Sequence, residues 1–210
     1  TLNVNLTIPY LFRSPVGSSI NLNIFKKDST FTNAKQAVEL FYQFDPNQKI
    51  GVEYSVERSN QINNNNTDID DFKSNFYNLN YNFLKLRKQD LLYQLNSSLN
   101  ISLGYGKRSS LNNTKQRHIK IKGNWLFELN KKNAFFINLH MEDLKSDGYL
   151  YNELIRFGGI TSIRGFEENS LFAKRMAVLC SEFRYRLSND LFIHSVIDSG
   201  YFEDFFKTDH

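Results

Sequence analysis

The chain has 210 residues, of which 40% are hydrophobic and 23% charged, and its formal net charge is +4. This balance is sufficient for a folded core and excludes a disordered tail, and the dispersed basic residues argue against a nucleic-acid partner. The sequence holds 19 Phe and 11 Tyr against 3 Pro and 2 Met, and it is rich in Asn. Because aromatic residues favour strands and Asn favours turns and polar faces, the composition indicates an all-β protein.

Hydropathy, the N-terminal residues and the single cysteine say little about the class of protein. No run of about eighteen apolar residues occurs, so no transmembrane helix is expected. Residues 1–10 lack the charged and apolar regions of a signal peptide, and the start at Thr1 suggests a processed protein or an excised fragment. Cys180 has no partner for a disulfide or a metal cluster, and we expect it to be a small buried or lumen-facing residue.

In chain order, the sequence alternates apolar and polar residues with the period of two that a strand with one apolar face requires. Short turns alternate with longer polar connections, of which the longest before the middle of the chain, 59–74, is rich in Asn and Asp and is expected to lie in water. Residues 26–36 and 106–117 are also predicted to be connections. The predicted strands are 2–12, 18–26, 37–44, 50–58, 75–86, 91–105, 119–129, 135–143, 175–187 and 191–202.

This layout is typical of an outer-membrane barrel. About ten antiparallel strands of about nine to eleven residues would cross a bilayer at a tilt, with short turns at one end and long loops at the other. One side of each strand is aliphatic or aromatic, and the other carries Asn, Gln, Lys, Glu and Arg. A soluble barrel would turn the apolar face inward, and alternation alone does not tell inside from outside, so a soluble ligand-binding β-barrel remains an alternative.

Residues 153–170 resemble neither a strand nor a helix and hold the least generic residues of the sequence. Gly158 and Gly159 are adjacent, and Gly165 follows Arg164. Glycine permits backbone dihedrals that other residues avoid, so the segment is expected to fold back tightly. An arginine fixed there suits docking against carboxylates. The alternative is an ordinary hairpin loop with a solvated arginine.

The two strands after this segment carry acidic residues on their polar faces. Strand parity places Glu182 together with Arg184 and Arg186, and it places Asp198 together with Gly200. In a barrel, both carboxylates would project into the lumen from neighbouring strands. There a returning arginine could neutralise them.

In this combination the sequence resembles the BamA superfamily of outer-membrane protein assembly and polypeptide-translocation barrels, also called the bacterial surface antigen family, which includes the two-partner secretion transporters. Members fold a long extracellular loop into the barrel, and the following strands carry an acidic position and a D-x-G element. Glu182 and Asp198 with Gly200 fit these positions in order. The resemblance implies that Arg164 pairs with Asp198, and with Glu182, to latch the loop in the lumen. The loop signature GG…(V/I)RG(F/Y) is matched by Gly158, Gly159, Ile163, Arg164, Gly165 and Phe166.

The resemblance covers the last quarter of the chain directly and implies a fold and a function. Family barrels have about sixteen strands, so residues 1–210 would be a single β-barrel domain that is a fragment of a larger barrel, without the POTRA repeats and the strands at each end. The implied function is insertion of outer-membrane proteins or translocation of polypeptides, in the outer membrane of a Gram-negative bacterium. The implied partners are outer-membrane lipids, unfolded outer-membrane or secreted client polypeptides and accessory lipoproteins, with no cofactor.

Two other classes of function were weighed. An enzyme would need a catalytic constellation, but His140 and His194 fall on predicted strands and His118 directly precedes one. No G-x-S-x-G, HExxH or Cys/His cluster occurs, so we expect neither catalytic residues nor a metal site. A passive porin would share the alternation without needing the arginine and its acids. The sequence leaves open whether the parent protein is an assembly factor, a secretion transporter or an exporter of lipoproteins.

Overall fold

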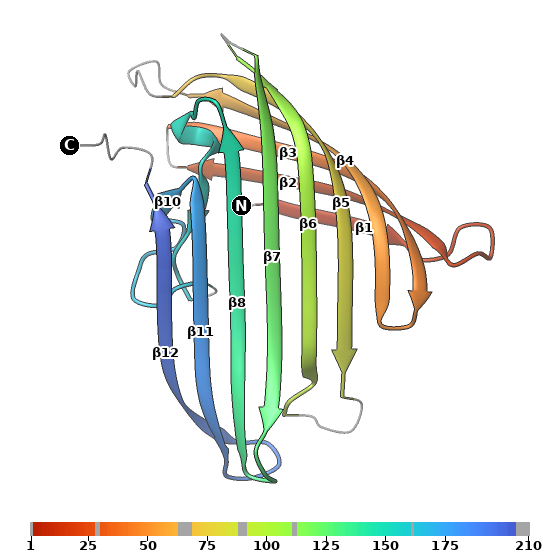
Figure 1. Ribbon diagram of the computed structural model, residues 1–210, viewed down its shortest axis with the longest axis vertical. Helices are drawn as coiled ribbons and strands as arrows, with labels where there is room; N and C mark the ends of the chain where they lie inside the picture. Colours follow the sequence, from red (N-terminus) through yellow and green to blue (C-terminus); the bar gives the residue numbers. More distant parts are fainter. Residues whose placement is uncertain are drawn as a thin grey trace. The chain divides into compact units, whose positions relative to one another are not determined.

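The computed structural model describes residues 2–27, 30–62, 69–87, 92–110, 113–160 and 162–204, and these form strands almost throughout. Within these ranges, ten long strands form one sheet in the order β1-β2-β3-β4-β5-β6-β7-β8-β11-β12 (Figure 1). In addition, β9 pairs with β10. The sheet is antiparallel and open, because its order ends at β1 and β12. The all-β prediction is confirmed. The elements are β1 (Leu2–Ile8), β2 (Val16–Lys27), β3 (Phe31–Asp45), β4 (Gln48–Gln61), β5 (Phe72–Leu86), β6 (Leu95–Ser109), β7 (Thr114–Glu128), β8 (Asn133–Ser146), the 3-10 turn η1 (Tyr151–Glu153), β9 (Ile155–Phe157), β10 (Leu171–Ala173), β11 (Arg175–Arg186) and β12 (Phe192–Glu203).

Most strands are longer than the sequence predicted. The strands β2 to β8 have 12 to 15 residues, and they take in parts of the expected connections 26–36 and 106–117. The reason is that the backbone ladder continues where both faces are polar, whereas the alternating pattern marks only the stretch with an apolar face. The boundaries, unlike the number of long strands, were therefore wrong.

Two local expectations are also corrected. The first strand ends at Ile8 instead of residue 12, because the chain turns at Phe12 and Arg13, whose φ angles are 53° and 61°. The connection 59–74 is not wholly in water, since Ser59 is 0% exposed at the end of β4. Residues 63–68 of this connection lie outside the described part of the chain.

In the middle of β3, aliphatic side chains are exposed and the glutamate between them is buried. Val38 and Leu40 are 52% and 58% exposed, whereas Glu39 between them is 9% exposed. The Glu39 carboxylate accepts hydrogen bonds from Ser19 Oγ at 3.2 Å and Asn80 Nδ2 at 2.9 Å. A water-soluble sheet would bury the aliphatic side chains instead. This arrangement is the one that a lipid-facing strand requires.

The chain divides into two compact units. The first contains Thr1–Tyr81, Ser102–Ile119 and Leu144–Leu154, and the second contains Asn82–Ile101, Lys120–Asp143 and Ile155–His210. The boundary between Leu154 and Ile155 falls inside the segment 153–170. That residues 1–210 are one fragment of a larger barrel domain stays a prediction. The described residues include no helix with the length and apolar content of a membrane span.

The second unit has a small apolar cluster near the turns. Tyr93, Leu126 and Ala134 are 4%, 6% and 2% exposed, and Phe136 and Phe192 pack against them. Tyr93 was expected within the strand 91–105, but β6 begins at Leu95. Tyr93 precedes the strand, so it can turn inward although strand parity would place it among the exposed apolar residues.

Candidate functional site

The segment 153–170 starts from ordered structure. Its first residue, Glu153, ends η1, and β9 pairs with β10 so that Ile155 lies opposite Ala173 and Phe157 lies opposite Leu171. The expectation of a wholly irregular segment was therefore wrong at its start. The short ladder closes the base of the loop that carries the glycines and the arginine.

The glycines occupy backbone conformations that other residues rarely adopt. Gly158, Gly159 and Gly165 have φ angles of +109°, +93° and +92°. A Cβ on Gly158 would lie 2.7 Å from the carbonyl oxygen of Glu167, and one on Gly159 would meet the Glu168 carboxylate. A Cβ on Gly165 would meet nothing within 4 Å. The first two glycines thus permit both the turn and the close approach of the returning chain, and Gly165 permits the turn.

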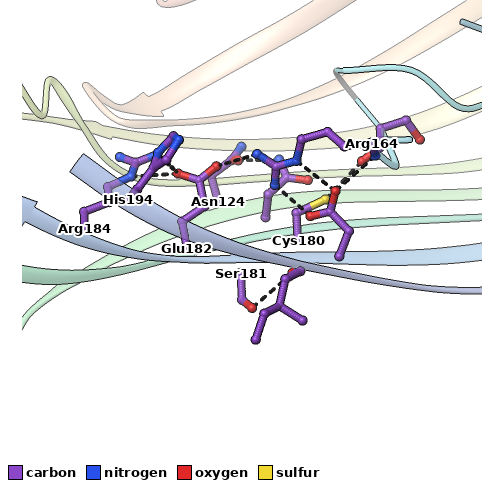
Figure 2. A network of polar contacts seen from close by, with 11 residues as sticks. Asn124, Arg164, Cys180, Ser181, Glu182, Arg184 and His194 are labelled. Carbon is purple, nitrogen blue, oxygen red and sulfur yellow. Dashed lines mark hydrogen bonds and ion pairs between the residues drawn. The ribbon is translucent and has the colours of Figure 1, made fainter. Parts of the chain in front are cut away.

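The loop brings Arg164 onto the polar face of β11 and β12 (Figure 2). Its Nε and Nη2 donate to Asp198 Oδ2 and Oδ1 at 2.8 and 2.7 Å, and its backbone N–H donates to Oδ2 at 3.0 Å. Its Nη1 donates to Glu182 Oε1 at 3.1 Å. The two-point contact with Asp198 matches the planar geometry of guanidinium and carboxylate. Asp198 is therefore the principal partner and Glu182 the second.

The charges of this site are unequally shielded. The side chains of Asp198 and Glu182 are 9% and 10% exposed, and that of Arg164 is 32% exposed. The hydrogen bonds that Arg164 donates to Asp198 raise the pKa of Arg164 further above its usual range, so the guanidinium stays charged. Two largely buried carboxylates on adjacent strands need a counter-ion, and the loop supplies it.

Neighbouring residues fit the loop to the strands. Ile163 Cδ1 lies 3.0 Å from the position of a Cβ on Gly200, so a glycine there leaves room for the isoleucine. Cys180, which is 7% exposed, donates its thiol to the carbonyl oxygen of Ser162 at 3.0 Å. Cys180 is buried under the loop. Phe166 is 48% exposed.

Sequence reasoning missed the surroundings of Glu182. Strand parity placed Arg184 on the same face as Glu182, but the aromatic residues around the Arg184 guanidinium come from β8, β12 and the residues before β6 and leave no local pattern. His118, His140 and His194 lie on three different strands, β7, β8 and β12. Among the residues that the structure describes, no group of three or more His, Cys, Asp or Glu is arranged to hold a metal ion.

A second arginine–carboxylate pair lies in the first unit and was also missed. Arg108, expected in the solvated connection 106–117, pairs through Nη1 with Glu153, and both side chains are 5% exposed. Gln116 Nε2 and the Leu150 backbone N–H each donate to Glu153 at 2.9 Å, and Arg108 Nη2 donates to Thr114 at 3.2 Å. Arg108 lies on a strand because β6 extends to Ser109, further than predicted, and Glu153 is the last residue of η1.

Asn152 extends this anchor. Its side chain is 0% exposed, and its Nδ2 donates to Ser59 Oγ at 2.6 Å and to the Asp70 carbonyl oxygen at 2.9 Å. Its own carbonyl oxygen accepts from Asn33 Nδ2 at 2.8 Å. The chain is therefore fixed to β3, β4 and the residues before β5 immediately before it reaches the loop.

Comparison with known proteins gives a structural likeness. No protein-family model matches the sequence, and no curated protein matches it. Among solved structures, the fold resembles CdiB from Acinetobacter baumannii, with a TM-score of 0.56 and 15% sequence identity. The match covers 98% of this chain and 37% of the CdiB chain. The fold is thus like part of CdiB, and this chain spans well under half of that protein's length.

Proposed function

We propose that this chain is part of an outer-membrane β-barrel that translocates polypeptides or inserts outer-membrane proteins. The observation that carries the proposal is the loop arginine: Arg164 makes three hydrogen bonds to Asp198 and one to Glu182 on the polar face of the sheet. The sequence resemblance to the BamA superfamily and the likeness of the fold to CdiB support it.

The exposed apolar face supports a location in the outer membrane of a Gram-negative bacterium. Val38 and Leu40 on β3, and Ile193 and Ile197 on β12, are at least half exposed, with values of 52%, 58%, 57% and 70%. In lipid, aliphatic side chains need no further cover, and sheet pairing satisfies the backbone hydrogen bonds. Outer-membrane lipids are the partner that this face fits.

The proposed mechanism is physical and not enzymatic. An incoming strand cannot cross lipid with unpaired backbone groups, so a barrel must offer it a strand edge or a polar lumen. The loop 153–170, latched in the lumen by Arg164, keeps that interior ordered while a client polypeptide passes or pairs. The clients are unfolded outer-membrane or secreted proteins, and accessory lipoproteins would deliver or receive them.

The test uses the full-length protein that contains this chain. Arg164→Ala and Asp198→Ala are compared with Arg175→Ala, which removes an arginine that is 51% exposed and paired with Asp143 and Glu203. At equal levels in the outer membrane, the first two variants should lose client export or assembly and the third should keep it. Undiminished activity of both Arg164→Ala and Asp198→Ala would contradict the latch.

Two measurements separate the proposal from its alternatives. Single-channel conductance with client-independent solute flux, and no effect on any client, would indicate a passive porin. A protein that stays monodisperse without detergent would indicate a soluble ligand-binding β-barrel.

A further inference from the structure

The two oxygens of Glu182 serve two different arginines (Figure 2). Oε1 accepts from Arg164 Nη1 at 3.1 Å. Oε2 accepts a hydrogen bond from Arg184 Nε at 2.9 Å, forms an ion pair with Arg184 Nη2 at 2.8 Å, and lies 3.4 Å from His194 Nδ1. Arg184 belongs to the same strand as Glu182, so its contact does not depend on the loop.

The Arg184 guanidinium is held by aromatic rings. Its carbon lies 4.1 Å from the ring centre of Phe136, 5.4 Å from that of Phe192 and 5.6 Å from that of Tyr93. Tyr93 and Phe192 also contact each other edge to face, with ring centres 5.5 Å apart. The electron-rich ring faces attract the cation, and packed rings leave it little rotational freedom.

The strand register explains how this arrangement forms. Arg184 lies opposite Ala134 on β8 and opposite His194 on β12, and Glu182 lies opposite Phe136. The small Ala134 leaves space for the arginine stem, and the guanidinium reaches diagonally toward the ring of Phe136. Residues two apart on a strand share a face, which brings Arg184 and Glu182 together.

We propose that Arg184 is a positioning residue that fixes Glu182 so that one carboxylate oxygen faces the incoming Arg164. A free glutamate side chain loses rotational freedom when it is ordered, and a side chain that is already ordered binds its partner more tightly. Arg184 also keeps Glu182 neutralised when the loop is absent. This inference rests on the proposed latch, and it assigns the aromatic site a role in it.

Cys180 provides the readout. It is the only cysteine of the chain, and the loop residue Ser162 covers its thiol. In the full-length protein, with any cysteine outside residues 1–210 replaced by serine, the rate of maleimide labelling, compared among variants after correction for the thiolate fraction of Cys180, reports how often the loop leaves. Arg184→Ala should raise this rate by about tenfold, the effect of losing one charge-assisted hydrogen bond. Arg184→Lys keeps the charge but not the planar guanidinium, and its labelling rate should lie between those of Arg184→Ala and the wild type.

A double-mutant cycle with Glu182→Gln distinguishes positioning from general loosening. If Arg184 acts through Glu182, then Arg184→Ala adds little to the labelling rate of Glu182→Gln. Full additivity of the two changes, or wild-type labelling of Arg184→Ala, would overturn the proposal. Arg175→Ala on the same strand should label as the wild type does.

The same experiment separates this inference from the proposed function. Rapid labelling of Arg164→Ala with slow labelling of Arg184→Ala would reject the positioning role and leave the latch intact. Slow labelling of both would reject the latch itself. If Arg184→Ala fails to reach the outer membrane, Phe136→Leu takes its place. This change removes the ring nearest to the guanidinium but keeps Arg184, and it should also raise the labelling rate.

Discussion

Two arginine–carboxylate pairs hold the connection between β8 and β11, and they differ in their contact with water. Arg108 and Glu153 are each 5% exposed, whereas Arg164 is 32% exposed above an Asp198 that is 9% exposed. A buried charge that loses its partner cannot be rehydrated without unfolding its surroundings, and a partly exposed one can. The first pair therefore suits a permanent anchor and the second a contact that opens and closes.

The position of each pair in the chain agrees with this difference. Glu153 ends η1 in the first unit, directly beside the fully buried Asn152. Arg164 lies in the second unit, beyond Gly158 and Gly159, in a loop whose base is closed by only three residue pairs of β9 and β10. A short ladder and an ion pair with a partly exposed arginine allow the loop to open at a lower free energy than the buried network around Glu153 requires.

The largest effect is expected from breaking the buried pair. Arg108→Ala leaves the Glu153 carboxylate without its cation and should lower the free energy of unfolding by about 3–5 kcal/mol. Urea titration in detergent micelles measures this. The exposed control Arg175→Ala should cost less than about 1 kcal/mol. Equal losses for the two variants would show that the Arg108 pair is not a structural anchor.

The two carboxylates that bind Arg164 should contribute unequally to holding the loop in place. Asp198→Asn weakens three hydrogen bonds and Glu182→Gln weakens one, so the first should raise the Cys180 labelling rate more. Charge-assisted hydrogen bonds of about 1.5–3 kcal/mol each correspond to at least tenfold for Asp198→Asn. If Glu182→Gln labelled faster than Asp198→Asn, the order of the two partners would be reversed.

The loop glycines offer a matched pair of smaller changes. Gly158→Ala adds a clash with the Glu167 carbonyl oxygen to the strain of its positive φ, whereas Gly165→Ala adds strain alone. The strain is about 1–2 kcal/mol in each case, so Gly158→Ala should raise the Cys180 labelling rate more than Gly165→Ala does. Equal rates would mean that the close approach at Gly158 does not contribute to the docked loop.

Salt should have the smallest effect on loop opening, and it should act through the partly exposed pair of Arg164 and Asp198. At about 1 M salt the screening length falls to about 3 Å, which weakens partly exposed ion pairs and leaves buried ones nearly unchanged. The Cys180 labelling rate should rise modestly with salt. In Arg164→Ala, which lacks the ion pairs between Arg164 and the two acids, the rate should depend less on salt.

The sequence predicted the fold class because strand parity is a local property. The alternation marked Glu182 and Asp198 as sharing the polar face of the sheet. The membrane-barrel interpretation added that apolar side chains such as Val38 face outward, where the structure exposes them. It could not predict strand ends, because a ladder between polar residues such as those around Arg108 leaves no apolar pattern. Boundaries depend on pairing with distant strands.

The candidate site was predictable to the same extent. Glycines and an arginine in one short segment are visible in sequence, and parity supplies the acids. The ring cluster around Arg184 comes from β8, β12 and the residues before β6, and the partners of Asn152 come from β4 and the residues before β5. Contacts assembled from remote elements require the fold itself.

The most direct test of the central claim, that Arg164 on Asp198 holds the loop, is a double-mutant cycle on Cys180 labelling. Arg164→Ala and Asp198→Asn are measured singly and together in the full-length protein in its membrane. The account predicts that each single change speeds labelling by about tenfold or more. The double variant should be far slower than the product of the two effects, because only the backbone N–H bond to Asp198 and the Glu182 contact are lost in addition. Rates that multiply, or single variants that label as the wild type does, would contradict it.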